Sequence, residues 1–229
     1  MRKAGRELSR IDEAIRVVYH ELDIRPVPVW EGHSEDDLWR ELVWCILGSR
    51  VHWEVSHAAL GRLGRAGLLS ADRWRGGLDE PEHATLLSLG RGYRFFRRTA
   101  GHIRGAAERV YDDGGSIRGL LGDGDGEDDV RRTFAAEIPG IGPKQASLYL
   151  RTIGFARRLA VLDVHVLTYL HWIGIIESGV RTINTLSRYE GLEELFMAYA
   201  DKRGYSPAAF DMAVWLVVRT AKRETTLWR

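Results

Sequence analysis

The chain has 229 residues, which is enough for one large domain or two small ones. Its 45% hydrophobic and 28% charged content is ordinary for a folded soluble protein, and we expect neither a membrane span nor a secretion signal, since no long apolar run and no basic leader is evident. A single cysteine, Cys45, excludes an internal disulfide and cannot alone hold a structural zinc, so we expect a cytoplasmic protein.

The net charge of +1 is a weak indication of nucleic-acid binding, because dedicated DNA-binding proteins often carry a strong basic excess. Nearly all basic residues are arginines. The only lysines are Lys3, Lys144, Lys202 and Lys222. Genomic composition bias explains the excess of arginine but not the position of Lys144, which is therefore conspicuous.

Apolar residues recur at helical spacing from Ile11 to Tyr19. Ser9 and Asp12 have the spacing of a capping box, which predicts a first helix over about residues 10–22. After a break at two prolines, Ser34 starts a second helix that runs through Leu47 and that we interpret as the central buried helix.

Glycine, proline or polar residues separate the further helical stretches. We predict these over residues 53–64, 90–111, 127–136, 143–153, 164–173, 185–202 and 207–223. No alternating pattern typical of a strand is present. The sequence therefore predicts an all-α fold, with one compact architecture of two helical lobes and no internal repeat.

An acidic segment, Asp123–Asp129, has alternating carboxylates like those of an EF-hand calcium loop. The fit is poor, because the required glycine position holds Asp128 and the glutamate position holds Phe134. We interpret the segment as a solvated acidic loop that leads into the start of the next helix.

A glycine hairpin, Ile138-Pro-Gly-Ile-Gly-Pro-Lys-Gln-Ala146, leads into the helix predicted over 143–153. Gly140 and Gly142 can adopt backbone angles that expose successive amides, and Pro143 suits a first helical turn. The hairpin and the helix N-terminus are therefore a candidate site for a DNA phosphate. A plain helix–helix turn is the alternative.

Asp163 follows Lys144 by nineteen residues, within Leu159-Ala-Val-Leu-Asp-Val-His165. The hairpin, the lysine and this aspartate together resemble the helix-hairpin-helix (HhH-GPD) superfamily of base-excision DNA glycosylases, and the lysine is similar to that of bifunctional 8-oxoguanine glycosylases. The resemblance implies that Lys144 is the Schiff-base lysine and Asp163 the catalytic aspartate. It also implies a single glycosylase unit over 1–229, with two helical lobes and the active-site cleft between them.

Within that unit, the helix-hairpin-helix spans about 130–154 and the aspartate loop about 155–165. Residues 38–47 and 93–110 are similar to the archaeal-type branch of these glycosylases, which has no iron–sulfur cluster. This similarity implies no cofactor, no iron–sulfur cluster and no catalytic metal, with a structural monovalent cation at the hairpin. It further implies a monomer that binds double-stranded DNA containing a modified base and associates with the nucleoid in a prokaryote. The backbone-binding residues are then Gly140, Ile141, Gly142 and Gln145.

The chemistry suits these residues. Breaking an N-glycosidic bond develops positive charge on the sugar, which the carboxylate of Asp163 stabilises. A neutral Lys144 attacks C1′ and forms an imine, from which β-elimination nicks the strand. Burial and the helix N-terminus are expected to lower the pKa of this lysine. The alternatives are that Asp163 is only a helix cap and that Lys144 is an exposed phosphate-binding residue.

A flipped base needs a wedge and a pocket. Arg50, His52 and Trp53 lie where related enzymes place glutamine or asparagine, so the wedge departs from the family pattern and leaves the opposite-base preference open. A buried Trp53 beside a solvated Arg50 is the alternative. Asp211 and Trp215, four apart on the last predicted helix, are candidates to bind a purine N–H and to stack on the base; a core tryptophan and a satisfied aspartate are equally compatible.

One further candidate surface is the helix face that carries arginines. They are Arg94, Arg97, Arg98 and Arg104, which either contact phosphates or are simply solvated. The leading hypothesis is excision of a damaged purine, 8-oxoguanine, followed by strand cleavage. The alternatives are a glycosylase of the same fold acting on another damaged or hypermodified base, and a non-catalytic DNA-binding module.

Overall fold

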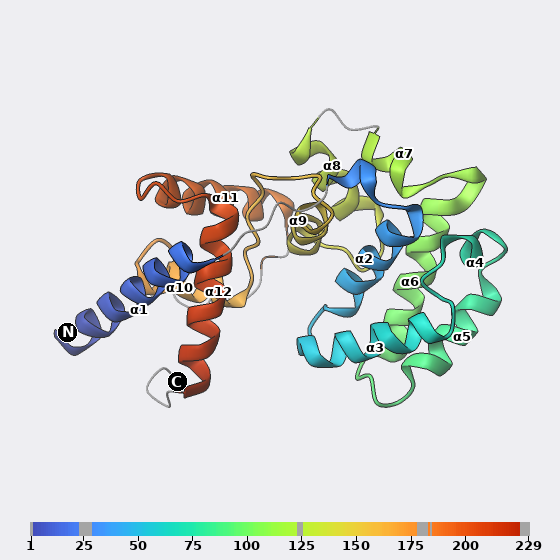
Figure 1. Ribbon diagram of the computed structural model, residues 1–229, viewed down its shortest axis with the longest axis horizontal. Coiled ribbons are helices and arrows are strands. Elements are labelled where there is room, and N and C mark those ends of the chain that lie inside the picture. Colours follow the sequence, from blue (N-terminus) through green and yellow to red (C-terminus); the bar gives the residue numbers. More distant parts are fainter. Residues whose placement is uncertain (1, 23–28, 123–125, 178–182, 184, 225–229) are drawn as a thin grey trace. The chain divides into compact units, whose positions relative to one another are not determined.

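The computed structural model describes residues 2–22, 29–122, 126–177, 183 and 185–224. Over these residues the regular secondary structure is helical and no strand occurs, which confirms the all-α prediction (Figure 1). The chain forms two compact units: Met1–Pro26 with Arg157–Arg229, called unit 1, and Val27–Ala156, called unit 2. None of the described helices is long and apolar enough to cross a membrane.

Unit 2 is built around α2 (Glu35–Leu47). The surrounding helices are α3 (Trp53–Arg65), α4 (Ala71–Arg75), α5 (Asp79–Leu89), α6 (Phe96–Tyr111), α7 (Ile117–Gly122), α8 (Glu127–Glu137) and α9 (Pro143–Thr152), with short 3₁₀ turns at Trp30–Gly32 and Asp112–Gly114. Five of them, α3, α4, α6, α7 and α9, pack against α2. The buried residues of α2 are Leu38, Trp39, Leu42, Val43, Cys45, Ile46 and Leu47. The predicted central helix is confirmed.

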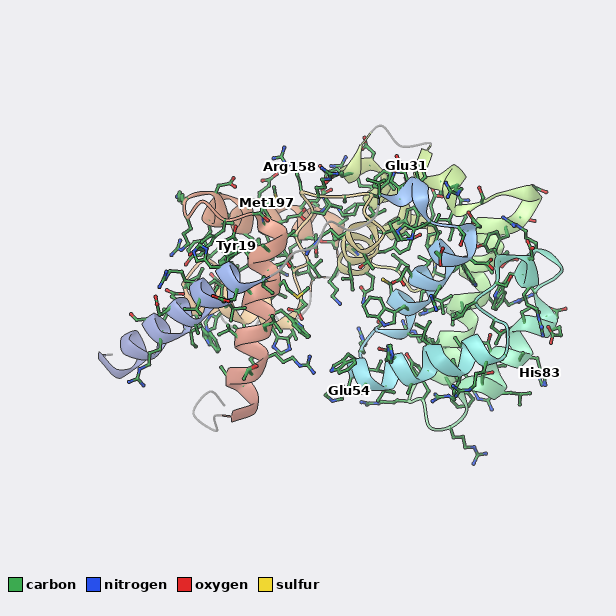
Figure 2. The ribbon with its side chains drawn as sticks, viewed as in Figure 1. Tyr19, Glu31, Glu54, His83, Arg158 and Met197 are labelled. Atoms are coloured by element: carbon green, nitrogen blue, oxygen red, sulfur yellow. The ribbon has the colours of Figure 1, made fainter. Side chains whose placement is uncertain are left out.

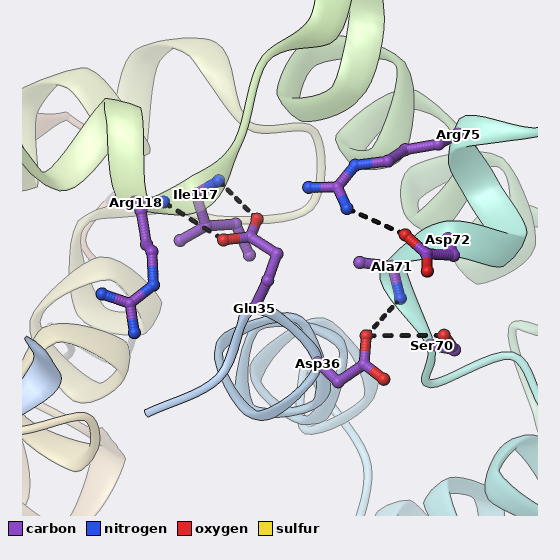
Figure 3. Close-up of polar contacts among 8 residues, drawn as sticks. All are labelled: Glu35, Asp36, Ser70, Ala71, Asp72, Arg75, Ile117 and Arg118. Carbon is purple, nitrogen blue, oxygen red and sulfur yellow. Dashed lines mark hydrogen bonds and ion pairs between the residues drawn. The ribbon is translucent and has the colours of Figure 1, made fainter. Parts of the chain in front are cut away.

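The start of α2 also organises its neighbours. Ser34 and Asp37 form a capping box, and the carboxylates of the two residues between them reach other helices. Glu35 accepts the N–H of Ile117 at 2.7 Å, and Asp36 accepts the N–H of Ala71 at 2.7 Å (Figure 3). These are first-turn amides of α7 and α4, which have no partner within their own helices. Two short helices are therefore held by carboxylates from α2.

Unit 1 consists of α1 (Arg2–Glu21), α10 (Val164–Trp172), α11 (Leu186–Asp201) and α12 (Pro207–Glu224). Its core is aromatic: the rings of Phe196 and Phe210 stack with centroids 5.2 Å apart. Tyr19 of α1, labelled in Figure 2, packs against Tyr205 at 4.2 Å. The first helix thus packs on the last, α12, although they come from opposite ends of the chain.

Several predicted boundaries were wrong. The first helix begins at Arg2, so Ser9 and Asp12 lie inside it and form no capping box; Asp12 instead accepts the hydroxyl of Tyr169 at 2.8 Å. The predicted helix over 90–111 begins only at Phe96, because Gly90 at φ +59° ends α5. The short helices α4, α5 and α7 were not predicted.

The acidic segment is only partly described, since residues 123–125 lie outside the described ranges. Glu127, Asp128 and Asp129 occupy the first turn of α8, where negative charge is favourable. Across the described residues no group of three or more His, Cys, Asp or Glu side chains is placed to hold a metal ion.

Candidate active site

The hairpin lies between α8 and α9. The N–H of Ile141 donates to the carbonyl of Ile138 at 3.1 Å and closes the turn, while both isoleucine side chains are buried. Gly140 adopts φ +85°, and a Cβ added to it would lie 2.9 Å from the Cβ of His102 on α6. The turn therefore requires glycine here both for its backbone angle and for the close approach of α6.

Helix α9 begins with an exposed set of backbone donors. Pro143 has no N–H, and Ala146 is the first residue of α9 whose N–H bonds back, to the carbonyl of Gly142 at 2.9 Å. The N–H groups of Lys144 and Gln145 therefore belong to the open first turn, which no side chain from the described part of the chain caps. Such a turn attracts an anion.

Lys144 is half-buried in this first turn, and α9 packs against α2. The neighbour on α2 is Cys45, whose side chain is buried. Burial raises the pKa of the Cys45 thiol to about 12; the nearby Lys144 ammonium opposes this rise and the Glu41 carboxylate adds to it. The thiol is thus protonated and not nucleophilic at neutral pH, and the nucleophilic role of Lys144 stays a prediction.

Asp163 is the N-cap of α10, as predicted. Its Oδ1 accepts the N–H groups of His165 at 2.8 Å and Val166 at 3.0 Å. Within the described residues no side chain or amide donates to Oδ2. The cap thus fixes the carboxylate through one oxygen and leaves the other for a ligand.

Three side chains hold the three residues before Asp163, and two of them, Tyr189 and Glu193, were not predicted from the sequence. Glu193 Oε1 accepts the N–H of Ala160 at 2.7 Å, and the hydroxyl of Tyr189 accepts the N–H of Leu162 at 3.0 Å. Asp211 Oδ2 accepts the intervening N–H, that of Val161, at 2.7 Å. One oxygen of Asp211 is therefore engaged by the backbone; its predicted contact with a purine stays a prediction.

Trp215 lies one turn after Asp211 on α12 and is partly exposed. Its ring meets the edge of His165 at 6.4 Å, and the guanidinium of Arg219 lies over it at 4.6 Å. The guanidinium covers one face of the ring, and the predicted stacking of Trp215 on a base stays a prediction.

The predicted wedge lies between α2 and α3. Arg50 is exposed and adopts φ +60°, a strained angle for a residue with a side chain. Trp53, which begins α3 next to the labelled Glu54 in Figure 2, is 53% exposed, and His52 is exposed as well. The alternative of a buried Trp53 is thus wrong, and strain together with an exposed aromatic ring favours a functional role for the segment.

The four predicted arginines differ in whether they pair with carboxylates. Arg104 pairs with Asp79 at 3.2 Å and with Glu82 at 3.3 Å. The other three predicted arginines, Arg94, Arg97 and Arg98, are exposed and have no carboxylate partner in the described ranges. Only these three are available for phosphates without breaking an ion pair.

The predicted site residues fall into two sets. Unit 2 holds Lys144, the hairpin and the segment from Arg50 to Trp53, whereas unit 1 holds Asp163, Asp211 and Trp215. The packing of α9 on α2 and of α10 on α12 holds the residues within each set. The predicted cleft between the lobes stays a prediction.

Comparisons with known sequences show which family the chain belongs to. The sequence model of a family described as 8-oxoguanine DNA glycosylase matches residues 24–205. The 8-oxoguanine DNA glycosylase/AP lyase of Saccharolobus islandicus is 30% identical over 185 residues, which cover 80% of this chain and 83% of that protein. The chain belongs to the 8-oxoguanine DNA glycosylase family. The resemblance read from the hairpin, Lys144 and Asp163 is thereby confirmed.

Other members of the family agree. The 8-oxoguanine DNA glycosylase/AP lyase of Korarchaeum cryptofilum is 27% identical over 184 residues, covering 80% of this chain and 81% of that one. The crystal structure of the 8-oxoguanine DNA glycosylase of Thermotoga maritima is similar with a TM-score of 0.72 and 26% identity, over 93% of this chain and 95% of that one. The glycosylase/lyase of Methanocaldococcus jannaschii, solved with a 15mer DNA containing 8-oxoguanine, has the same fold, with a TM-score of 0.69 and 22% identity over 93% of this chain and 90% of that one.

The family match includes the hairpin, Lys144 and Asp163 but ends before Asp211 and Trp215, whose base-pocket roles stay predictions.

Proposed function

We propose that this chain excises 8-oxoguanine from double-stranded DNA and then cleaves the strand by β-elimination. The observation that carries the proposal is the placement of Lys144 in the open first turn of α9, directly after the glycine hairpin, in a chain of the 8-oxoguanine DNA glycosylase family. The relatives from Saccharolobus islandicus and Korarchaeum cryptofilum are named 8-oxoguanine DNA glycosylase/AP lyase, which supports both steps.

In the proposed reaction the neutral amine of Lys144 attacks C1′ of the damaged nucleotide. The N-glycosidic electron pair leaves with the base, which takes up a proton, and the carboxylate of Asp163 stabilises the positive charge that develops on the sugar. Opening of the sugar ring gives an imine between C1′ and Nζ. Loss of a C2′ proton then expels the 3′ phosphate and nicks the strand.

DNA is proposed to bind across the hairpin. The N–H groups of Lys144 and Gln145 point out of the open turn and suit a phosphate oxygen. Arg98 lies one turn before His102 on α6, and a Cβ added to Gly140 would lie 2.9 Å from His102. This arginine therefore extends the positive surface of the hairpin, and Trp53 is the proposed wedge that occupies the space left by the flipped base.

Borohydride trapping tests the nucleophile. The wild-type chain is expected to crosslink to an 8-oxoguanine duplex, whereas Lys144→Gln is expected to give no crosslink. Lys202→Gln is a matched control because this lysine is exposed at the end of α11, and it is expected to crosslink like the wild type. Crosslinking by Lys144→Gln, or none by the wild type, would refute the lyase proposal.

The segment from Arg50 to Trp53 favours a second candidate within the same chemistry, the excision of a different damaged or hypermodified base. A panel of duplexes with different lesions, each opposite all four bases, separates the two by the rate of base release. Salt-dependent binding with no base release from any duplex would instead favour the non-catalytic module.

Four further expectations stay predictions: a monomer, a cytoplasmic and nucleoid location, no iron–sulfur cluster, and a monovalent cation at the hairpin. The last is tested by comparing DNA affinity in potassium and in tetramethylammonium salts at equal ionic strength, since the organic cation is too large for a carbonyl site.

A further inference from the structure

The segment Ala160–Leu162 has an unusual set of hydrogen-bond partners. It comes directly before Asp163 and is not helical, and the described part of the chain has no strand to pair with it. Buried amides must nevertheless be satisfied. Each of its three consecutive N–H groups donates to a different side chain: to Glu193, to Asp211 and to Tyr189.

These three acceptors are deeply buried. Glu193 and Asp211 are each 4% exposed and Tyr189 is 1% exposed. Carboxylates are rarely so buried, because removing a charge from water is costly, and an apolar side chain of similar volume would fill the same core without that cost. Their hydrogen bonds to the backbone, at 2.7 Å, are short and charge-assisted. These hydrogen bonds fix the geometry of the segment.

Tyr189 makes the tightest constraint. Its hydroxyl donates to the carbonyl of Ala160 at 2.7 Å and accepts the N–H of Leu162 at 3.0 Å. One oxygen atom thus bridges the backbone groups on either side of Val161. The N–H of Asp163 itself donates to the carbonyl of Val161 at 3.0 Å. On its other side, Asp163 is fixed by its own cap on α10. The aspartate is therefore held from both directions.

We infer that Tyr189, Glu193 and Asp211 are positioning residues that act on base excision through Asp163. The inference rests on the proposed function. A carboxylate stabilises a developing charge most when its direction is fixed before the reaction, because no energy is then needed to orient it. The three side chains fix the backbone that carries the carboxylate, and none of them needs to touch the DNA to do so.

Tyr189→Phe tests the inference with little change of volume, since it removes only the bridging hydroxyl. Base release is measured in single turnover with enzyme in excess over an 8-oxoguanine duplex. We expect the rate to fall roughly ten- to a hundredfold, the loss that a misplacement of about 1 Å produces, with unchanged DNA affinity. Tyr199→Phe is the control: it removes a hydrogen-bonded hydroxyl from the same helix, 3.0 Å from Tyr169, without touching the segment, and is expected to keep the wild-type rate.

A double-mutant cycle distinguishes positioning from general loss of structure. If Tyr189 acts through Asp163, Tyr189→Phe should change the residual rate of Asp163→Asn less than about twofold, because coupled residues are not additive. An equal loss in both backgrounds would overturn the inference. If Asp163→Asn is slow but Tyr189→Phe is not, only the inference fails; if Asp163→Asn excises at the wild-type rate, the proposed function fails and the inference with it.

A second pair of variants covers the case that Tyr189→Phe does not fold. Glu193→Gln keeps an oxygen that can accept the N–H of Ala160, whereas Glu193→Leu does not. We expect Gln to retain the rate within about threefold and Leu to lose roughly tenfold or more, both at unchanged DNA affinity. Equal rates for the two variants would contradict positioning by this hydrogen bond.

Discussion

The two hairpin glycines should respond very differently to the same substitution. Gly140 has φ +85°, and an added Cβ would lie 2.9 Å from both Cβ and Nδ1 of His102. A left-handed residue with a side chain costs about 1–2 kcal/mol. Inserting a methyl group into packed surroundings costs about 1–3 kcal/mol more. Gly140→Ala should therefore lower the free energy of unfolding by roughly 2–5 kcal/mol, the sum of these two ranges.

Gly142→Ala is the matched control two residues away. Its φ of −101° is open to any residue, and the nearest atom to an added Cβ is Gln145 Oε1 at 3.8 Å. We expect this variant to stay within about 1 kcal/mol of the wild type. Urea unfolding, followed by tryptophan fluorescence, measures both variants. Equal stabilities for Gly140→Ala and Gly142→Ala would refute the assignment of strain and close contact to Gly140.

Three other predictions concern charge. Glu35→Ala should lower the free energy of unfolding by about 1–3 kcal/mol, because it leaves first-turn amides of α7 without an acceptor. The control is Glu108→Ala at an exposed position, which should change the free energy of unfolding by less than about 0.5 kcal/mol in the same urea assay. Hydrogen bonds from Ser34 lower the pKa of Asp37 in the folded chain, so the charged carboxylate stabilises the fold above its unfolded pKa of about 4, and this stabilisation is lost as the pH falls further. The difference in unfolding free energy between the wild type and Asp37→Asn should therefore shrink below that pH, and a constant difference would contradict the prediction. Arg98→Ala should reduce the slope of log affinity against log salt by about 1 for duplex DNA, measured by fluorescence anisotropy, and an unchanged slope would exclude a phosphate contact.

The hairpin and the aspartate cap could be predicted because their signals are local. Glycine at a left-handed position, proline in a first turn and aspartate at an N-cap each act within a few residues. The partners of the aspartate loop could not be predicted, since Tyr189 and Glu193 lie 27 and 33 residues beyond the amides they accept. Nothing in the periodicity of their helix distinguishes a buried acceptor from a surface residue.

The missed helices have a related cause. Isolated helices of fewer than about twelve residues are marginal, so their stability comes from tertiary contacts rather than from their own sequence. Helix α7 has six residues and is capped by Glu35, 82 positions earlier in the chain. Helix α4 has five residues and its first N–H donates to Asp36, 35 positions earlier. Such helices become predictable only when the fold of α2 and its neighbours is known.

The net charge of +1 does not describe how the charges are distributed over the chain. Several of its acidic side chains accept backbone N–H groups within the fold. They include Glu35, Asp36, Asp163, Glu193 and Asp211. Arg94, Arg97 and Arg98 instead stay exposed, without carboxylate partners in the described ranges. Binding of a phosphate depends on the local field rather than on the sum of charges, so a net charge near zero is compatible with the proposed binding of DNA across the hairpin and the start of α6.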